Sequence, residues 1–428
     1  MANSILLRFS LENYRSFTTR KSISFIPASI KDSPITNVMN LENHKYLRTS
    51  AIYGANSSGK SNLIKAMGTM KLIVRSSVKI NKGDELPYDP FLLHYKKNNK
   101  PTLFEAEFLV DGIFYRYGFT YTKDEICDEW LIRNNSKLYL RTVEGIGVNE
   151  ELFPEGKDLE ERTNSNRLFL SVVGQLGGDI SNSIVNFFST GMNVISGLET
   201  DDYRVFTQVV LKDQMEGHLE IINFFNKLQL GFSNLKTTEH VFDASEIPAD
   251  IPRALKNSII KKLSGKKSID VFSSHGIYDD SGKKVATQDF VFEKMESEGT
   301  QKIFDLAGPI FDTINNGAVL IVDELDAKMH PLISQELVSL FNSPIHNPNG
   351  AQLIFTTHDT NLLSSRLLRR DQIWFTEKDL QERTDLYNIM QILLPDGTKP
   401  RGDGNLERNY IRGRYGAIPY IQTSTTLE

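Results

Sequence analysis

The chain of 428 residues has one cysteine, Cys127, and lacks a long apolar run. A single thiol cannot form an internal disulfide or build a cysteine-based zinc site, and it is typical of a reducing cytoplasm. No segment approaches the ~20 apolar residues that a membrane-spanning helix needs. We therefore expect a cytoplasmic protein without a membrane partner.

A strong charge of either sign is also missing. The 49 lysines and arginines against 54 aspartates and glutamates give a net charge of −5. No global basic field therefore favours nucleic acid, and any such contact must come from a local basic patch. The hydrophobic share of 39% and the charged share of 24% are ordinary for globular proteins and exclude a disordered or collagen-like chain. The length allows two or three domains.

The apolar pattern changes twice along the chain. Residues 1–125 are rich in alternating strand-like runs, including two runs joined by an Asp111-Gly112 turn. Residues 205–230 carry apolar side chains at helical spacing. After residue 268, strand-like and helix-like runs alternate again. This order predicts an α/β fold in which two half-domains, residues 1–125 and 268–428, flank a mainly helical insertion at residues 126–267.

The strongest motif is Gly54–Ser61, which fits G-x-x-x-x-G-K-[ST] between a predicted strand and a predicted helix. Its glycines let backbone N–H groups surround phosphates, and the helix N-terminus adds partial positive charge. Lys60 can reach the β- and γ-phosphates, and the Ser61 hydroxyl can ligate Mg²⁺. A glycine turn with an incidental lysine is the alternative, which the flanking elements disfavour. The predicted nucleotide-binding residues are Gly54, Ala55, Asn56, Ser57, Ser58, Gly59, Lys60, Ser61 and Asn62.

Two apolar runs end in residues suited to phosphate chemistry. Residues 318–322 are followed by Asp323, which can hold Mg²⁺, and by Glu324, which can position and deprotonate the attacking water. Residues 351–355 lead to His358, which can contact the γ-phosphate. A solvated strand end and a structural histidine are the alternatives, but the phosphate loop favours the chemical interpretation. The predicted catalytic residues are thus Lys60, Glu324 and His358.

A turn of small residues, Ser297–Gln301, opens a predicted helix. Such a helix N-terminus can bind phosphate through Ser297 and Gly299. The simpler interpretation is a helix cap, and taken alone the cap is favoured.

These four motifs, in this order, resemble those of ABC-type ATPase heads of the RecF and SMC kind. The resemblance implies a P-loop NTPase fold of ABC-ATPase head type with ATP and Mg²⁺ as cofactors. It also implies a homodimer or higher homo-oligomer in which Ser297 and Gly299 of one copy face the ATP held by Lys60 of another. The signature Ser-Glu-Gly-Thr-Gln departs from the transporter sequence Leu-Ser-Gly-Gly-Gln, which disfavours a transport function.

A narrower resemblance concerns bacterial anti-phage systems. Asp323–Asp326 followed by Met329–Pro331, and the C-terminal segments Arg408–Tyr410 and Gly413–Pro419, resemble ATPases of abortive-infection, OLD-like and PARIS-like systems. This implies a sensor and scaffold that controls a separate toxic effector, for which a nuclease is the expectation. Residues 126–267 would then be the partner or sensor region.

Two other functions stay open. A RecF-like DNA-repair ATPase would clamp DNA in its ATP-bound dimer, using basic patches at residues 255–267 and at Arg366, Arg369 and Arg370. For the lysines at residues 255–267, a solvated helix face is the alternative, and the arginines could equally bind an acidic partner. A scaffold that binds ATP without hydrolysing it is disfavoured because Glu324 is intact.

Overall fold

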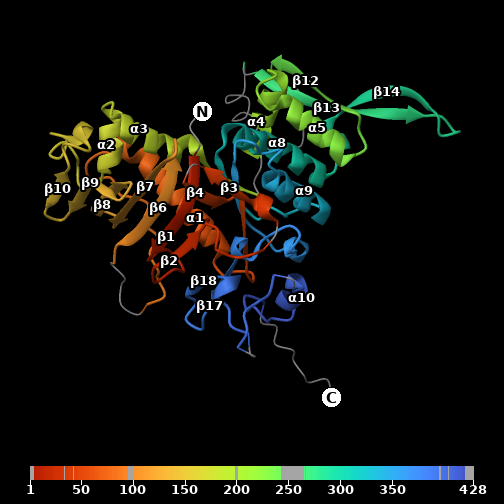
Figure 1. The fold of residues 1–428 in the computed structure, drawn as a ribbon. Helices are drawn as coiled ribbons and strands as arrows, with labels where there is room; N and C mark the ends of the chain where they lie inside the picture. The colour runs from red at the N-terminus through yellow and green to blue at the C-terminus, as the bar shows by residue number, and fades with distance from the viewer. Residues whose placement is uncertain are drawn as a thin grey trace. The chain divides into compact units, whose positions relative to one another are not determined.

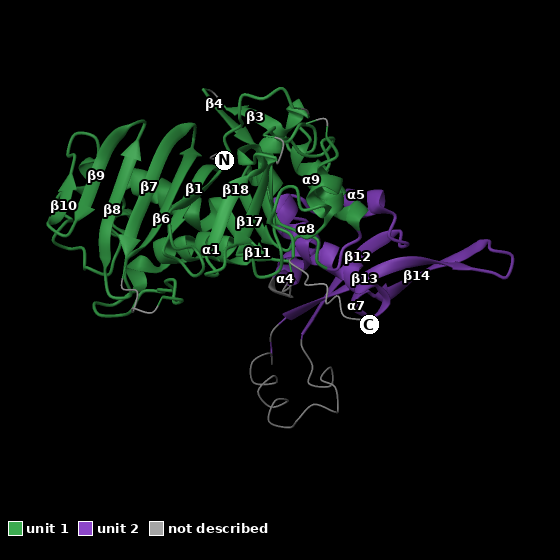
Figure 2. Cartoon of the chain, turned by 90° about the horizontal axis from the view of Figure 1, so that it is seen from below, with its two compact units in different colours: residues 1–198, 313–327, 331–428 green, residues 199–312, 328–330 purple. Residues whose placement is uncertain are grey.

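The computed structural model describes residues 4–32, 34–41, 43–94, 100–197, 201–241, 265, 267–394, 397–402 and 404–419 (Figure 1). The chain forms two compact units, coloured separately in Figure 2. Unit 1 comprises residues 1–198, 313–327 and 331–428, and unit 2 comprises residues 199–312 and 328–330.

Unit 1 contains a six-stranded sheet with the strand order β11-β15-β16-β5-β17-β18. Neighbouring strands are parallel except for the antiparallel pair β17–β18. The carboxyl ends of β5, β15, β16 and β17 therefore share one edge, which is where α/β folds bind ligands. The strands are β5 (Thr49–Tyr53), β11 (Met192–Ser196), β15 (Val319–Asp323), β16 (Gln352–Thr356), β17 (Ile373–Lys378) and β18 (Thr384–Asn388).

The predicted buried strands and the predicted helix after the phosphate loop are confirmed. The apolar runs form β15 and β16, whose central residues Leu320 and Ile354 are buried. Helix α1 (Lys60–Ser76) follows β5 and places Leu63 and Met67 in the main core, together with Ile321 of β15. Apolar side chains three and four residues apart give α1 one continuous buried face.

A second, seven-stranded sheet of unit 1 is antiparallel and has the order β10-β9-β8-β7-β6-β1-β2. The predicted hairpin is present, because Asp111 and Gly112 both adopt positive φ angles of 52° and 74° between β6 and β7. The strands are β1 (Ser4–Glu12), β2 (Lys21–Ser24), β6 (Thr102–Val110), β7 (Ile113–Tyr121), β8 (Ile126–Arg133), β9 (Ser136–Thr142) and β10 (Gly145–Val148).

The region expected to be a mainly helical insertion differs in structure at its start. Residues 126–148 form β8, β9 and β10, which extend the sheet of the N-terminal half. The β8–β9 turn contains Asn134 and Asn135, both with positive φ, a conformation that asparagine tolerates better than most residues. Strand β11 also belongs to unit 1, where it pairs with β15.

Unit 2 holds helices and a three-stranded antiparallel sheet of order β12-β13-β14. The helical spacing at residues 205–230 correctly predicted its helices α4 and α5. The elements are α4 (Asp201–Lys212), α5 (His218–Leu228), β12 (Asn234–Val241), β13 (Lys267–Tyr278), β14 (Lys284–Val291), α7 (Phe292–Met295) and α8 (Glu298–Asn316), the last of which continues into unit 1.

Helix α8 contains Pro309, which lacks the N–H that would bond to the carbonyl of Asp305. The hydroxyl of Thr207 from α4 donates to this carbonyl at 3.2 Å and accepts from Gly308 N at 2.9 Å. One buried hydroxyl thus repairs the break in the helix ladder and ties α4 to α8.

Shorter elements complete unit 1. They are β3 (Val38–Leu41), β4 (His44–Leu47), α2 (Phe169–Gln175), α3 (Asp179–Asn186), α9 (Pro331–Asn342) and α10 (Leu406–Ile411). The buried carboxylate of Glu129 accepts from the first N–H groups of α2, at Phe169 and Leu170, and its burial raises the pKa of Glu129. Within the described ranges, no helix has the length and apolar character needed to cross a bilayer.

Candidate nucleotide site

A pocket of about 570 Å³ opens at the carboxyl edge of the parallel sheet. Most of the phosphate loop lines this pocket together with Glu324 and His358. In the sequence, both of these residues lie hundreds of positions after the loop. The predicted residues Gly54, Ala55 and Asp323 do not line it, whereas Lys378, which the sequence analysis missed, does. The lining residues are Asn56, Ser57, Ser58, Gly59, Lys60, Ser61, Asn62, Glu324, His358 and Lys378.

The phosphate loop depends on glycine at its last turn. Gly59 has φ of +112°, and a Cβ there would lie 2.3 Å from Oγ1 of Thr384. No side chain caps the start of α1, so its first N–H groups stay available for an anion.

Side chains of the neighbouring strands β17 and β18 form hydrogen bonds with the phosphate loop. The hydroxyls of Ser58 and Thr376 of β17 are 2.6 Å apart, and Thr384 of β18 donates to the carbonyl of Ser58 at 2.9 Å. Ser16, from the turn after β1, links Thr384 at 2.7 Å with Asn62 at 2.8 Å. The loop is therefore fixed by three separate segments of unit 1 before any ligand binds.

Lys60 is almost completely buried, with 5% exposure. Its Nζ donates to the carbonyls of Gly54 at 2.8 Å and Ala55 at 3.0 Å. Burial lowers the pKa of Lys60 to about 8, against the opposing effect of the nearby Asp323 and Glu324 carboxylates. A bound phosphate would give this amine a negatively charged hydrogen-bond acceptor, whereas the two carbonyls that it now contacts are neutral.

The two acids at the carboxyl end of β15, Asp323 and Glu324, both contact one residue of β16. The hydroxyl of Thr356 donates to Oδ1 of Asp323 at 2.6 Å and accepts from the backbone N–H of Glu324 at 2.7 Å. Glu324 has φ of +58°, a left-handed conformation that is unusual outside glycine. The Thr356 hydroxyl therefore fixes the metal-binding candidate and the catalytic candidate together.

His358 lies at the end of the intervening strand β16 and lines the pocket. Its backbone N–H donates to Oδ2 of Asp326 at 3.3 Å. Partial burial and the nearby Lys60 ammonium lower the pKa of His358. This shift favours the neutral imidazole, which can donate one hydrogen bond to a phosphate oxygen.

The residues present suit Mg²⁺ held jointly with phosphates. Ser61 lines the pocket, and Thr356 engages only one of the two carboxylate oxygens of Asp323. In addition, Oδ1 of Asp326 is buried without a hydrogen-bond partner. Among the described residues, no three His, Cys, Asp or Glu side chains cluster to hold a metal by themselves. This pattern fits Mg²⁺, which proteins bind through one or two carboxylates plus substrate phosphates.

The two signature residues belong to unit 2. Ser297 accepts from the N–H of Thr300 at 3.2 Å and so caps α8, as the simpler sequence interpretation expected. A Cβ on Gly299 would lie 2.9 Å from the carbonyl of Lys328, so glycine permits the close approach of that segment. Ser297 remains exposed, and its role toward a nucleotide stays a prediction.

A protein family described as "AAA domain, putative AbiEii toxin, Type IV TA system" matches residues 50–144 and 168–364. The chain belongs to this family. In this AAA-domain protein the phosphate loop follows β5, and the acids Asp323 and Glu324 stand at the end of β15. His358 follows β16, the strand that lies between β5 and β15 in the sheet. The expected α/β fold of a P-loop NTPase is confirmed, because the phosphate loop connects β5 of a mainly parallel sheet to helix α1. No curated protein matches the chain.

Solved structures similar to this AAA-domain protein are distant in sequence. The SMC head domain from Thermotoga maritima is 12% identical, with 90% of this chain and 98% of that chain covered and a TM-score of 0.42. The recombination mediator protein RecF, in the structure named RecF-ATPrS, is 14% identical, with 90% of this chain and 98% of that chain covered and a TM-score of 0.36. An Smc head domain derived from Pyrococcus furiosus, bound to a domain of ScpA, is 12% identical, with 90% and 96% covered and a TM-score of 0.38.

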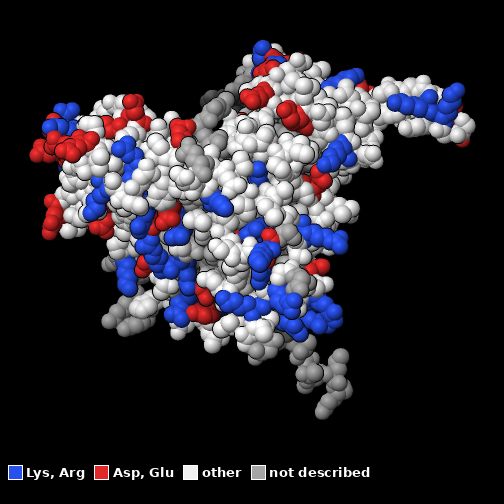
Figure 3. Space-filling model, viewed as in Figure 1, with Lys and Arg blue, Asp and Glu red and all other residues white. Residues whose placement is uncertain are grey.

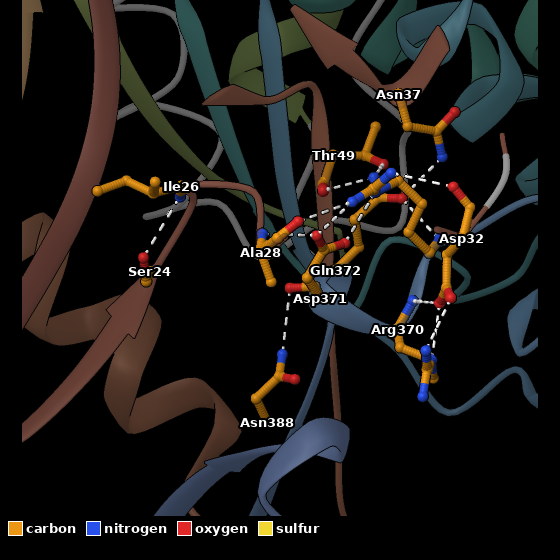
Figure 4. A network of polar contacts seen from close by, with 11 residues as sticks. Ser24, Ile26, Ala28, Asp32, Asn37, Thr49, Arg370, Asp371, Gln372 and Asn388 are labelled. Atoms are coloured by element: carbon orange, nitrogen blue, oxygen red, sulfur yellow. Dashed lines mark hydrogen bonds and ion pairs between the residues drawn. The ribbon is translucent and has the colours of Figure 1, made fainter. Parts of the chain in front are cut away.

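The arginine cluster predicted as a basic patch of this AAA-domain protein is mostly internal, so that prediction is wrong. Arg369 is 4% exposed and forms a buried ion pair with Asp371 at 2.7 Å. Arg370 donates to both carboxylate oxygens of Asp32 at 2.8 Å (Figure 4). Arg366 alone of the three is exposed. Two of the arginines therefore join segments of unit 1 rather than contact a polyanion.

The second predicted basic patch, the lysine run at residues 255–267, lies almost wholly outside the described residues. On the face drawn in Figure 3, basic side chains gather instead over the segment around α10. Arg408, Arg412 and Arg414 are exposed there.

Proposed function

We propose that the chain is a Mg²⁺-dependent ATP hydrolase of ABC type. The observation that carries the proposal is the single pocket that joins Lys60, Ser61, Glu324 and His358 from three distant segments. Phosphoryl transfer to water needs positioning and charge stabilisation rather than covalent chemistry. These four side chains supply a cation, a metal-ligating hydroxyl, a base and a neutral donor for that purpose.

Each residue has a distinct part in the proposed hydrolysis. Lys60 and the N–H groups at the start of α1 would hold the β- and γ-phosphates. Ser61 and Asp323 would hold Mg²⁺, which would supply positive charge opposite the phosphate oxygens. Glu324 orients a water molecule in line with the γ-phosphate and accepts its proton. His358 donates to a γ-phosphate oxygen.

The test compares phosphate release and nucleotide binding in three variants. Glu324→Gln should bind ATP with wild-type affinity yet lose at least a hundredfold in hydrolysis rate, because a base and water-orienting group is missing. Lys60→Ala should lose ATP binding. Glu150→Gln, at an exposed carboxylate paired with Lys157 in unit 1, is the matched control and should hydrolyse normally. Normal hydrolysis by Glu324→Gln would refute the assignment of the base.

The active assembly is proposed to be a homodimer or a higher homo-oligomer. Ser297 and Gly299 of one copy would contact the ATP bound by the other, so that ATP closes the assembly and hydrolysis reopens it. Light scattering after size-exclusion chromatography should show Glu324→Gln doubling in mass with ATP, whereas Lys60→Ala stays unchanged. A Glu324→Gln protein that binds ATP and remains a monomer would refute this part.

The biological role is proposed to be that of an ATP-dependent sensor and scaffold in an anti-phage system with a separate toxic effector. The support is the family description, which names an AbiEii toxin and a type IV toxin–antitoxin system, together with the sequence resemblance to abortive-infection and PARIS-like ATPases. Residues 126–267 would include the partner or sensor region. Affinity capture of Glu324→Gln from the native host, with and without ATP, should recover a nuclease or toxin in an ATP-dependent manner.

A DNA-clamping repair ATPase is the second candidate. Its supports are weaker than the sequence suggested, because Arg369 and Arg370 are used within unit 1. The exposed arginines around α10 leave a local basic surface (Figure 3). ATP-dependent retention on DNA that falls steeply with salt, with no effector recovered, would favour this candidate.

A further inference from the structure

Lys378 lines the nucleotide pocket but has no part in the hydrolysis described above. Its side chain is 28% exposed and contacts Glu382, four residues later, at 3.4 Å. Glu382 is 64% exposed, so this ion pair is a weak surface interaction that a bound anion can replace.

The position of Lys378 follows from strand alternation. Side chains two residues apart point to the same face of a strand, so Lys378 shares its face with Thr376, whose hydroxyl contacts Ser58 of the phosphate loop. Across the β17–β18 ladder, Lys378 is paired with Thr384, which donates to the carbonyl of Ser58. The amine is therefore anchored beside the phosphate loop by the same two strands that support the loop.

The strand order separates Lys378 from the hydrolytic residues. Glu324 and His358 follow β15 and β16 on one side of β5, and Lys378 ends β17 on the other side. Three strand spacings lie between β15 and β17, which is roughly 14 Å at ~4.8 Å each. A nucleotide whose γ-phosphate lies within reach of Glu324 can therefore extend across the pocket toward β17, where Lys378 also lines it.

We propose that Lys378 binds a phosphate oxygen in the part of the nucleotide between the β-phosphate and the nucleoside. This part is present in both ATP and ADP. The inference rests on the proposed nucleotide-binding function and adds a second cation to the site. Lys60 holds the end of the triphosphate that reacts, and Lys378 holds the end that does not. An interaction that is equal in the ground state and the transition state lowers KM and leaves kcat unchanged.

The experiment measures Kd for ATP and ADP by titration calorimetry on the full chain, with KM and kcat for ATP, in Lys378→Ala, Lys378→Arg and Glu382→Gln. Lys378→Ala should raise Kd for both nucleotides by the same factor, about tenfold for one lost charge-assisted contact, and raise KM in parallel. Its kcat should stay within twofold of wild type. Lys378→Arg should restore most of the affinity, and Glu382→Gln should leave it unchanged.

Several outcomes would overturn the proposal. They are an unchanged affinity in Lys378→Ala, a loss for ATP but not ADP, or a fall in kcat at constant KM, which would place Lys378 at the γ-phosphate. An arginine that does not restore binding would mean that shape rather than charge matters. If the wild type binds neither nucleotide, the proposed function itself fails. If Lys60→Ala loses binding and Lys378→Ala does not, only this inference fails.

Discussion

Replacing Thr356 by valine isolates one buried hydroxyl that organises both acids of the site. The hydroxyl donates to Asp323 and accepts from the N–H of Glu324, and Thr356 is fully buried. Valine keeps nearly the same shape but leaves a carboxylate oxygen and a backbone N–H without these partners. A hydrogen bond to a charged group contributes ~1.5–3 kcal/mol, and an unsatisfied buried N–H costs ~1–3 kcal/mol.

If about 2 kcal/mol of this free energy positions the two acids in the transition state, kcat should fall about thirtyfold. The affinity for ATP should change little, because the phosphate loop is untouched, while the Mg²⁺ concentration needed for half-maximal rate should rise. Phosphate release across a Mg²⁺ titration measures both effects. Thr357→Val is the matched control, since the hydroxyl of this neighbouring buried threonine accepts from the N–H of Asp359. Wild-type kcat and Mg²⁺ dependence in Thr356→Val would refute the reasoning.

Three further predictions concern the loop, the ion pairs and pH. Gly59→Ala should abolish nucleotide binding because of its positive φ and the 2.3 Å clash, whereas Gly83→Ala, with positive φ of +93° and open space, should bind ATP normally in the same titration. Arg369→Ala should lower the free energy of unfolding, measured by urea denaturation, by about 3 kcal/mol, because it leaves the buried carboxylate of Asp371 without its ion-pair partner. The control Arg366→Ala, at an exposed arginine, should leave the free energy of unfolding unchanged, and equal effects of the two substitutions would contradict the assignment. Burial lowers the pKa of Lys71 from 10.5 to about 8. Between these pH values the unfolded chain binds more protons than the folded chain, so the free energy of unfolding rises with pH. Lys71→Met should flatten that rise, and an unchanged slope of the free energy of unfolding between pH 8 and pH 10 would be evidence against this prediction.

The sequence predicted the parts of the site that depend on local pattern. Gly59 and Lys60 stand in a motif whose spacing is set by the phosphate group itself, and the strands before Asp323 and His358 are continuous apolar runs, which is typical of strands covered on both faces. Because parallel strands end at one edge, the convergence of these residues followed from the strands alone.

The rest depended on contacts between distant segments. Lys378 lines the pocket only because β17 pairs with β5, and no local pattern near residue 378 indicates that pairing. Arg369 and Arg370 look like a basic patch in sequence, but their partners Asp371 and Asp32 are identified only by the fold. The strands at residues 126–148 were missed because their Asn134-Asn135 turn lacks the glycine that marks the Asp111-Gly112 hairpin.

The left-handed backbone of Glu324 has a consequence for how this protein can evolve. A glycine at position 324 would relieve conformational strain of about 1 kcal/mol or more, so Glu324→Gly should fold more stably than the wild type. It would also remove the proposed base. Under the proposed function, selection for thermal stability and selection for ATP turnover would act in opposite directions at this position, and a relative that no longer needed hydrolysis would be free to lose the glutamate.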